Sequence, residues 1–360
     1  MPRHGEHPSA FCLRLKCLSA DKPRHGTCCF LTLDSLCLLW GQQVAGKAKV
    51  AVMSGQACTI GVVLSKRIIA GLLKPDGTLD RIHSYPEDEL YEDALVEMPR
   101  EHLIAALCDQ ILAVIKANPD VQLEGIGVAL PGLVRHGVVE DSPNLPQMKG
   151  ARIVAEICQL LKEHGISLSV TAVNDADAVA AGLSHQQGKL DSMIRVWTIG
   201  TGIGFGRYPL VEGVGEGGHT VVTLDDRETY CGCGGRGHME GIMGHRAMRL
   251  RFLDMEPEDV FEAADKGDQR CIEFKKLWHK ALAAATASSI HVSGAGKFYL
   301  TGYNVRFVEL PLLNHYIQQM VRLSPLQAFS VEIHPHNPET IVTGAAVIGR
   351  TASLVPSAAA

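Results

Sequence analysis

The sequence has no apolar run long enough to cross a lipid bilayer. A membrane-spanning helix needs about 18 or more consecutive apolar residues. The apolar run at 28–40 is shorter, contains Asp34 and begins too far into the chain for a standard signal peptide. We therefore expect no membrane partner.

An excess of positive charge is absent as well. The 360 residues contain 34 Lys and Arg against 39 Asp and Glu, which gives a formal net charge of −5. A protein that binds nucleic acid through its phosphates needs a basic surface, so we expect no nucleic-acid partner. Hydrophobic residues at 46% and charged residues at 20% are typical of a globular protein, and this length predicts two lobes.

The 11 cysteines do not form the pattern of a secreted disulfide framework. Five of them lie within the first 40 residues: Cys12, Cys17, Cys28, Cys29 and Cys37. Four others stand singly in apolar surroundings, which is typical of core thiols: Cys58, Cys108, Cys158 and Cys271. We expect a reducing, cytoplasmic location.

Residues 1–52 lack both a sustained hydrophobic period and a helix-turn-helix pattern. We interpret them as a disordered extension, or as a start assigned too early with Met53 as the true first residue. The stretch 41–48 resembles a P-loop, but it lacks the final Ser or Thr that would bind Mg²⁺ and no convincing strand precedes it. We assign no function to this segment.

From residue 58 onward, turn residues and periodic apolar residues predict a mixed α/β protein. Residues 58–85 predict three antiparallel strands, with a turn at Pro75-Asp76-Gly77. The following elements are predicted as helices over 100–117 and 151–164 and strands over 121–130 and 167–173. The order β-β-β-α-β-α-β predicts a sheet with helices on its faces.

A second α/β lobe is predicted to follow. A strand over 195–199 runs into a glycine-rich turn at 200–206 and a returning strand. This turn fails the Rossmann spacing G-x-G-x-x-G, but its backbone N–H groups and the Thr201 hydroxyl can still bind phosphates. The remaining predicted elements are helices over 239–253, 257–264, 271–290 and 312–323, strands over 297–300 and 329–334, and a last helix that opens at 343–346.

Two thiols and two imidazoles recur close together in this second lobe. His219, Cys231, Cys233 and His238 follow the pattern H-x(11)-C-x-C-x(4)-H, with four glycines around the cysteines that permit a tight backbone. Sulfur and nitrogen ligands suit tetrahedral Zn²⁺. The alternatives are a Cys231–Cys233 disulfide, which a single intervening residue disfavours, and a glycine-rich loop with chance cysteines. We favour a closed structural zinc site.

Two carboxylates, Asp175 and Asp177, follow the strand predicted over 167–173, where an alanine-rich helix begins. Open α/β sheets place reacting groups at the carboxyl ends of their strands. One of the two carboxylates is expected to cap the helix by accepting its N–H groups, which leaves the other free. The sequence alone favours neither.

From about residue 58 to 354 these motifs resemble the ROK family of repressors, open reading frames and bacterial sugar kinases. The most specific similarity lies at 215–219 and 231–240, which resemble the family's G-E-x-G-H and C-x-C-G-x-x-G-C-x-E motifs. Supporting similarities lie at 130–132, 143–146, 173–176, 200–206 and 344–346. The resemblance implies an α/β, actin-like (ribonuclease-H-like) ATPase fold of two lobes around a central cleft, and a homodimer.

The resemblance also implies an activity, the ATP-dependent and Mg²⁺-dependent phosphorylation of a hexose or N-acetylhexosamine, as in glucokinase. Asp175 would be the general base. The sugar hydroxyls would be bound by Asn144, Asn174, Glu216, His219 and Glu240. The ATP phosphates would be bound by Gly200, Thr201, Gly202 and Gly204, with Gly302 near the adenosine. His219 would use one ring nitrogen for the zinc and the other for the sugar.

Two departures from the family pattern bear on this activity. His238 replaces the third cysteine, which leaves a Cys₂His₂ zinc site. In the first phosphate loop, Asp-x-Gly-Gly-Thr-Lys or Asn, the aligned stretch 63–68 has Val63 for the aspartate and has lost both glycines. Lys66 and Arg67 would have to supply positive charge there. Phe205, where glycine is usual, departs from the second loop as well.

Three functional classes therefore stay open. We favour the sugar kinase over a catalytically impaired, sugar-binding sensor or regulator, and both over a DNA-binding repressor, because no helix-turn-helix precedes the kinase-like region. The expected division of the chain is an extension (1–52), an N-terminal lobe (53–186), a C-terminal lobe with the zinc loop (187–340) and a final helix on the N-terminal lobe (341–354).

Overall fold

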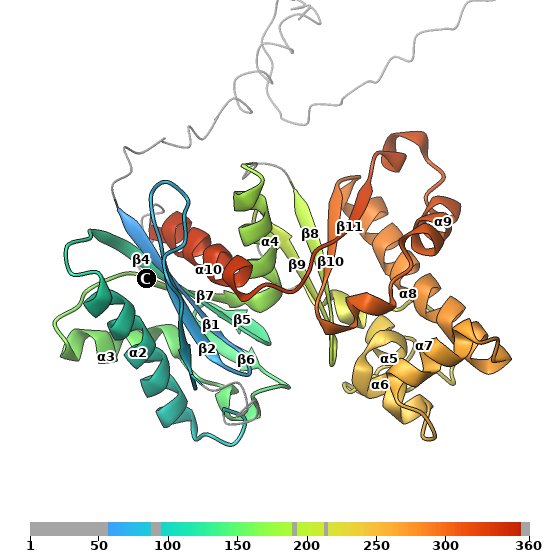
Figure 1. Ribbon diagram of the computed structural model, residues 1–360, viewed down its shortest axis with the longest axis horizontal. Helices are drawn as coiled ribbons and strands as arrows, with labels where there is room; N and C mark the ends of the chain where they lie inside the picture. The colour runs from blue at the N-terminus through green and yellow to red at the C-terminus, as the bar shows by residue number, and fades with distance from the viewer. Residues whose placement is uncertain (1–56, 88–94, 189–192, 212–214, 354–360) are drawn as a thin grey trace, which may run out of the picture. The chain divides into compact units, whose positions relative to one another are not determined.

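The computed structural model describes residues 57–87, 95–188, 193–211 and 215–353 (Figure 1). All of them belong to one compact unit, Gly55–Ala360. The extension expected at 1–52 and its P-loop-like stretch lie outside the described residues, and the division into lobes stays a prediction. Among the helices that are described, none combines the length and the apolar character that a bilayer crossing requires.

The first sheet has five strands in the order β3-β2-β1-β4-β7. Their bounds are β1 (Cys58–Leu64), β2 (Ile68–Leu73), β3 (His83–Tyr85), β4 (Leu123–Leu130) and β7 (Val170–Asn174). The first three strands form the predicted antiparallel meander, and β1, β4 and β7 run parallel. Leu130 pairs with Asn174 in register. The turn that follows β4 therefore lies beside the start of the helix that follows β7.

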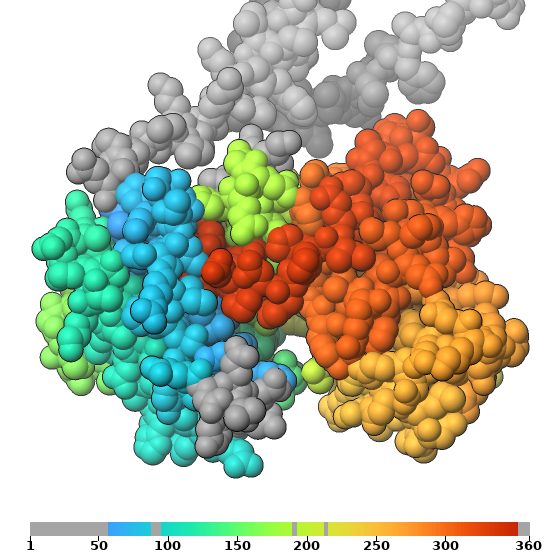
Figure 2. Space-filling model, viewed as in Figure 1, coloured from blue at the N-terminus to red at the C-terminus, as the bar shows by residue number. Residues whose placement is uncertain are grey.

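Helices cover both faces of this sheet. The helices α2 (Arg100–Ala117) and α3 (Ile153–Glu163) share one apolar core with the sheet, and α4 (Asp175–Gln186) and α10 (Pro338–Ser353) share another (Figure 1). The backbone of α10 approaches β1 and β4 so closely that only glycine fits. A Cβ atom on Gly61 would lie 1.9 Å from the carbonyl oxygen of Val342, and one on Gly127 would lie 1.8 Å from that of Ala345. The β1–β2 hairpin and α10, far apart in sequence, therefore lie side by side (Figure 2).

The second sheet has four strands in the order β11-β10-β8-β9. Its strands are β8 (Ile194–Ile199), β9 (Ile203–Tyr208), β10 (Lys297–Thr301) and β11 (Ser330–Ile333). The helices of this half are α5 (Met239–Met243), α6 (His245–Arg251), α7 (Pro257–Asp265), α8 (Gln269–Ser293) and α9 (Leu310–Met320). Short 3₁₀ helices span Pro146–Met148, Gly217–His219, Tyr303–Phe307 and Ser324–Gln327. Trp197, Trp278 and Phe298 are fully buried in the core of this half.

The structure differs from the predicted elements at three places. The hairpin formed by β5 (Leu133–Arg135) and β6 (Val138–Asp141) was not predicted, because its strands are too short for a periodic signal. The single helix predicted over 239–253 is broken at Gly244, because this residue is extended and lies against the backbone: a Cβ atom there would be 3.0 Å from the carbonyl oxygen of Thr201. The last helix begins at Pro338 rather than at 343, with the Asn337 side chain accepting the N–H of Glu339.

Candidate active site

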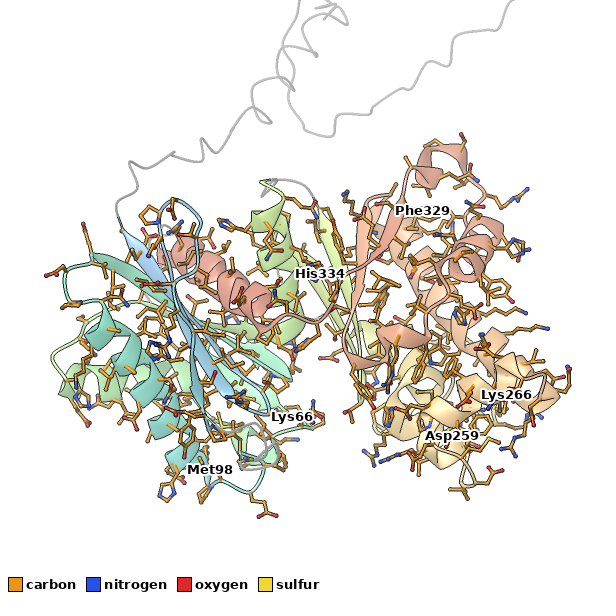
Figure 3. The ribbon with its side chains drawn as sticks, in the orientation of Figure 1. Lys66, Met98, Asp259, Lys266, Phe329 and His334 are labelled. Carbon is orange, nitrogen blue, oxygen red and sulfur yellow. The ribbon has the colours of Figure 1, made fainter. Side chains whose placement is uncertain are left out.

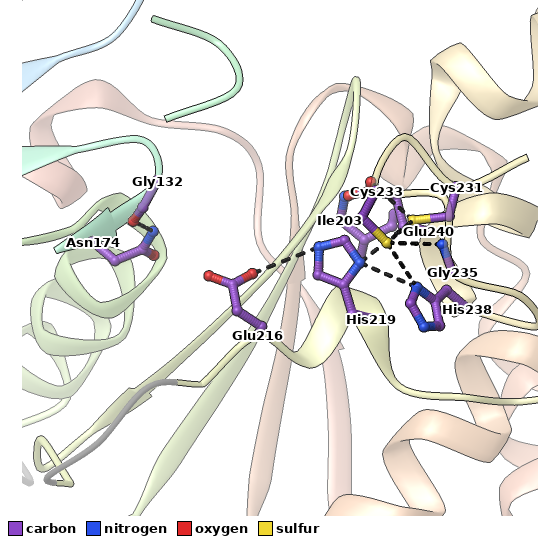
Figure 4. Close-up of polar contacts among 10 residues, drawn as sticks. All are labelled: Gly132, Asn174, Ile203, Glu216, His219, Cys231, Cys233, Gly235, His238 and Glu240. Atoms are coloured by element: carbon purple, nitrogen blue, oxygen red, sulfur yellow. Dashed lines mark hydrogen bonds and ion pairs between the residues drawn. The ribbon is translucent and has the colours of Figure 1, made fainter. Parts of the chain in front are cut away.

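The junction between β7 and α4 is organised by Asn174. Its Oδ1 accepts the N–H of Ala176 at 2.9 Å and its Nδ2 donates to the carbonyl of Gly132 at 2.8 Å (Figure 4). Asn174 is therefore the N-cap of α4, and the expectation that Asp175 or Asp177 would be the cap was wrong. The cap residue is the last residue of the strand because β7 ends where its neighbour β4 turns away at Pro131.

Asp175 is the first residue of α4, and its Oδ1 also accepts the N–H of Ala176, at 2.8 Å. Burial raises the pKa of Asp175, the N–H of Ala176 opposes this rise, and the carboxylate of Glu216 adds to it. A buried carboxyl whose pKa is raised holds a proton more strongly than an exposed one.

Asp177 has a different role from its neighbour. Its Oδ1 accepts the backbone N–H of Arg207 at 2.9 Å, which ties α4 to β9. Burial raises the pKa of Asp177 to about 6, an effect that the Arg207 N–H and side chain oppose. Asp177 is thus held by a contact with another element, whereas the hydrogen bond of Asp175 among the described residues is to its own helix.

The four predicted zinc ligands come together. Their ligand atoms all lie within 4.8 Å of one another, in the group His219, Cys231, Cys233 and His238 (Figure 4). We call this group the His/Cys cluster. The distances are 3.4 Å between the two Sγ atoms, 3.4 Å from Cys231 Sγ to His219 Nδ1, 3.2 Å from Cys233 Sγ to His238 Nδ1, and 3.3 Å between the two Nδ1 atoms.

These distances fit a tetrahedral zinc ion. Ligands about 2.0–2.3 Å from a central Zn²⁺ stand roughly 3.3–3.8 Å apart in a tetrahedron, and the observed separations lie at or just below this range. The disulfide alternative does not hold, because both cysteines are free and their sulfurs are 3.4 Å apart. The donor set and its geometry therefore fit the metal that the sequence predicted.

Glu216 and His219 extend from the cluster toward the first sheet. The ring of His219 faces the cluster with Nδ1 and turns Nε2 toward Glu216, whose Oε2 is 3.9 Å away. Figure 4 shows Glu216 between His219 and Asn174. One imidazole thus faces the cluster with Nδ1 and Glu216 with Nε2. That these two nitrogens bind zinc and a sugar hydroxyl stays a prediction.

Glu240 lies on the other side of the cluster. Its Oε2 accepts the backbone N–H of Ile203 at 2.9 Å, and Oε1 lies 3.7 Å from Cys231 Sγ. The carboxylate therefore lies against the glycine-rich turn between β8 and β9. This hydrogen bond was not foreseen, because it joins residues 37 positions apart in sequence.

The turn from Gly200 to Gly204, which we call the glycine turn, is hydrogen-bonded to the start of α6. The N–H groups of His245 and Arg246 donate to the carbonyls of Gly200 and Thr201 at 3.0 and 3.3 Å. The N–H of Gly200 donates within the turn to Gly202. No residue in the described ranges accepts a hydrogen bond from the N–H of Thr201 or Gly202. Two adjacent N–H groups of this kind can form an anion-binding nest.

Gly302 lies beside the glycine turn. Its φ of 97° and a close approach to β8, where a Cβ atom would lie 2.7 Å from the carbonyl oxygen of Ile199, both require glycine. Tyr303 follows it and was not singled out from the sequence. This residue is 56% exposed, with the Arg306 guanidinium 4.0 Å from the ring centroid and the hydroxyl donating to Glu258 at 2.8 Å. An aromatic residue directly after Gly302, the glycine predicted to lie near the adenosine, was the signal that could have revealed it.

Phe205 does not obstruct the glycine turn. The Phe205 ring packs against Trp197 with centroids 4.4 Å apart. Gly217 also lies close, since a Cβ atom there would be 2.5 Å from the Cβ atom of Phe205. Glycines on either side of Phe205 instead face α4, since a Cβ atom on Gly206 would lie 1.9 Å from the carbonyl oxygen of Ala176. The departure at this position is therefore accommodated within the core.

The β1–β2 hairpin contains the stretch 63–68, which departs from the first phosphate loop of the family. Val63 is buried in β1, and Lys66 lies at the tip of the β1–β2 hairpin (Figure 3). The Arg67 guanidinium donates to the carbonyls of Pro86 and Glu87 at 3.0 and 2.9 Å, so it binds the chain after β3. Asn144, the remaining predicted sugar ligand, lies exposed in the turn after β6.

Comparison with known proteins assigns the chain to a family. The model of the ROK family matches residues 85–351, and the chain belongs to this family. It is 30% identical over 192 residues to a glucokinase of Pyrobaculum calidifontis, covering 49% of this chain and 61% of the glucokinase. It is 27% identical over 244 residues to an N-acetylmannosamine kinase of Haemophilus influenzae, covering 64% of this chain and 79% of that kinase. The chain thus spans less than two thirds of the glucokinase.

Solved structures agree on the fold. A ROK hexokinase from Thermus thermophilus has a TM-score of 0.68 at 22% identity, covering 82% of this chain and 98% of that one. A ROK family transcriptional regulator, a homologue of the E. coli MLC protein, has a TM-score of 0.65 at 19% identity, with 83% and 79% covered. The predicted α/β, actin-like ATPase fold is confirmed. Because the same fold occurs in a kinase and in a regulator, it does not by itself decide the activity.

Proposed function

We propose that this protein phosphorylates a hexose or an N-acetylhexosamine with ATP. The observations that support the proposal are the place of Asp175, as the buried first residue of α4 directly after β7, and the His219 ring, which faces the His/Cys cluster with Nδ1 and Glu216 with Nε2. Its curated relatives described above, a glucokinase and an N-acetylmannosamine kinase, support the same substrate class.

Asp175 acts as the general base in the proposed mechanism. It takes the proton of a sugar hydroxyl as that oxygen attacks the γ-phosphorus of ATP, and the bond from phosphorus to the ADP oxygen breaks in line. Burial raises the pKa of Asp175, which makes its carboxylate a stronger base at neutral pH. Mg²⁺ supplies charge neutralisation on the phosphates when it is bound.

The sugar is proposed to lie in front of Glu216, within reach of Nε2 of His219. Carboxylate, amide and imidazole groups match the alternating donors and acceptors of a sugar. Asn174 keeps one amide hydrogen and one lone pair beyond its two hydrogen bonds to Gly132 and Ala176. For Glu240, the oxygen assigned to the sugar is Oε1, which lies 3.7 Å from Cys231 Sγ. Asn144 is assigned to the same site on the resemblance alone.

The nucleotide is proposed to lie against the glycine turn. The N–H groups of Thr201 and Gly202 are the proposed donors for its phosphates, and Gly204 is assigned to the same site on the resemblance alone. Gly302 borders the turn, and the exposed face of the Tyr303 ring is the surface for the base. In the His/Cys cluster, a zinc ion with four protein ligands leaves no open position, so its proposed role is structural.

A catalytically impaired, sugar-binding sensor or regulator is the second candidate. It is favoured by the β1–β2 hairpin, where Val63 carries no carboxylate for Mg²⁺ and Arg67 is committed to the carbonyls of Pro86 and Glu87. In this alternative the sugar site is kept and phosphoryl transfer is lost.

A coupled assay of ADP release separates the two. The purified protein is given ATP and Mg²⁺ with glucose, mannose, fructose, allose, N-acetylglucosamine and N-acetylmannosamine in turn, and sugar binding is measured in parallel by calorimetry. Turnover on at least one sugar supports the kinase. Sugar binding without turnover supports the sensor, and neither binding nor turnover contradicts both. The proposed homodimer is tested on the same sample by its mass in solution.

A further inference from the structure

We propose that Glu240 is a positioning residue that couples the His/Cys cluster to the glycine turn, so that zinc in the cluster sets the conformation of the turn. The coupling itself stands on the geometry below. Its consequence for nucleotide affinity rests on the proposed function.

Glu240 bridges the two features through its two carboxylate oxygens. Oε2 accepts the N–H of Ile203 at 2.9 Å, at the point where the glycine turn enters β9. Oε1 faces Sγ of Cys231 at 3.7 Å. The fit on the turn side is tight, since a Cβ atom on Gly202 would lie 2.5 Å from Oε2. One side chain therefore contacts the turn and a cluster thiol at the same time.

The cluster determines where Glu240 lies, because one of its members adjoins the short helix that carries Glu240. His238 is the residue before α5 and Glu240 is the second residue within it. The start of α5 packs on the backbone at Cys231: a Cβ atom on Gly241 would lie 2.8 Å from the backbone nitrogen of Cys231. A metal ion holds such ligands at fixed distances, and without it their mutual positions depend on weaker contacts. Losing the metal should therefore loosen the start of α5 and, with it, the carboxylate.

Glu240 in turn determines which N–H groups of the glycine turn are available. The N–H of Gly200 is used within the turn and that of Ile203 is used by Glu240, while those of Thr201 and Gly202 have no acceptor among the described residues. Without Glu240 the Ile203 N–H loses its acceptor, and the second half of the turn loses a side chain that fixes it. This role differs from the contact with a sugar hydroxyl that the family resemblance implies, because it uses Oε2 and not Oε1.

Substitutions of Glu240 separate the hydrogen-bond acceptor from the negative charge. Glu240→Gln keeps an oxygen that can accept the Ile203 N–H, while it removes the negative charge. Glu240→Ala removes the acceptor. Gly202→Ala displaces the carboxylate from the turn side without touching a zinc ligand. Glu262→Ala is the matched control, since Glu262 is an exposed carboxylate on α7 whose salt bridge is to Lys266, at the end of that helix, away from the cluster and the turn.

Two measurements are made on each variant and on the wild type before and after zinc removal with a chelator. Hydrogen exchange of peptides covering 199–205 reports the turn directly, and binding of a fluorescent ADP reports the nucleotide site. Zinc content and circular dichroism check that each variant is loaded and folded. We expect Glu240→Ala, Gly202→Ala and zinc removal to speed exchange in this peptide and to weaken ADP binding about tenfold, the loss of one charge-assisted hydrogen bond. Glu240→Gln should stay within about twofold of the wild type and of the control.

The outcomes are distinguishable. Unchanged exchange in zinc-loaded Glu240→Ala and Gly202→Ala overturns the coupling, whether or not nucleotide binds. If zinc removal unfolds the protein, these two variants still decide between the positioning role and its absence. Fast exchange in the variants without any ADP binding by the wild type would keep the coupling and overturn the proposed kinase function. Equal losses in Glu240→Gln and Glu240→Ala would overturn the positioning role in favour of a requirement for charge.

Discussion

Nδ1 of His219 lies 3.4 Å from Sγ of Cys231, and this contact turns the opposite nitrogen of the same ring toward Glu216. A single imidazole therefore belongs both to the His/Cys cluster and to the proposed sugar site. In the neutral ring only one nitrogen carries a hydrogen, and a metal on Nδ1 would leave that hydrogen on Nε2, where it can donate to Glu216 or to a sugar hydroxyl. The four predictions below test this arrangement and the proposed activity around it.

Zinc should be present at about one ion per chain and should stabilise the fold. Cys231→Ala removes a buried ligand and is expected to abolish zinc binding and to lower the unfolding temperature by roughly 10 °C. Metal analysis and thermal unfolding measure both effects. Cys158→Ala is the control, because Cys158 lies outside the cluster, on α3. A Cys231→Ala protein that keeps zinc would contradict the cluster as the ligand set.

Asp175→Asn should lower kcat by about 10²–10⁴-fold, the usual contribution of a general base. Sugar affinity should change little, since the amide keeps an oxygen that accepts the Ala176 N–H. Steady-state kinetics and calorimetry with the best sugar give the two numbers. Asp259→Asn, at an exposed carboxylate on α7, serves as the control (Figure 3). An Asp175→Asn enzyme with an unchanged kcat would remove Asp175 from the role of base.

Asp177 should make the folded state less stable as the pH rises. Its pKa is about 6 in the folded protein against an ordinary value of 3.8, so between these values the folded state binds more protons than the unfolded one. Stability is then lost as the pH rises from about 4 to about 6, up to roughly 3 kcal/mol for a shift of about two pKa units.

Asp177→Asn should therefore increase the free energy of unfolding at pH 7.5 and flatten its change between pH 4 and 6. The amide oxygen can still accept the N–H of Arg207, so the tie between α4 and β9 is kept. Denaturant unfolding of both proteins at several pH values makes the comparison. Parallel curves for the variant and the wild type would show that Asp177 does not titrate in this range.

Tyr303→Ala should weaken nucleotide binding without affecting the sugar. Stacking of a base on an aromatic ring contributes about 1–3 kcal/mol, so KM for ATP should rise by about tenfold while KM for the sugar stays constant. Tyr303→Phe keeps the ring and should stay close to the wild type. Leu253→Ala, at a side chain 88% exposed, controls for the loss of a surface apolar group. Equal changes in the two KM values would indicate a structural role for Tyr303.

The parts of the fold that the sequence predicted are those decided by local contacts. The helix α2 runs from Arg100 to Ala117, as its apolar spacing predicted, because Asn118 ends it by donating its side-chain amide back to Val114. The His/Cys cluster was also predictable, since its ligand types and spacing specify a metal without reference to the rest of the chain.

The errors lie where a distant backbone intervenes. The break at Gly244 depends on the carbonyl of Thr201, and the cap of α4 is Asn174 because the turn at Gly132 lies beside it. The hydrogen bonds from the Arg67 guanidinium to the carbonyls of Pro86 and Glu87 likewise depend on where the chain runs after β3. None of these contacts leaves a periodic signal in the sequence, because each joins residues from different elements.

The sequence by itself determined the chemistry that this protein carries: two thiols and two imidazoles at metal spacing, a carboxylate at the end of a strand, and a glycine-rich turn. The tertiary structure alone decided which atom of each residue meets which partner. Nδ1 and not Nε2 of His219 faces the thiols, and Oε2 of Glu240 reaches Ile203. The physical reason is that side-chain orientation follows from packing between elements far apart in the chain, whereas residue type and spacing are fixed by covalent order.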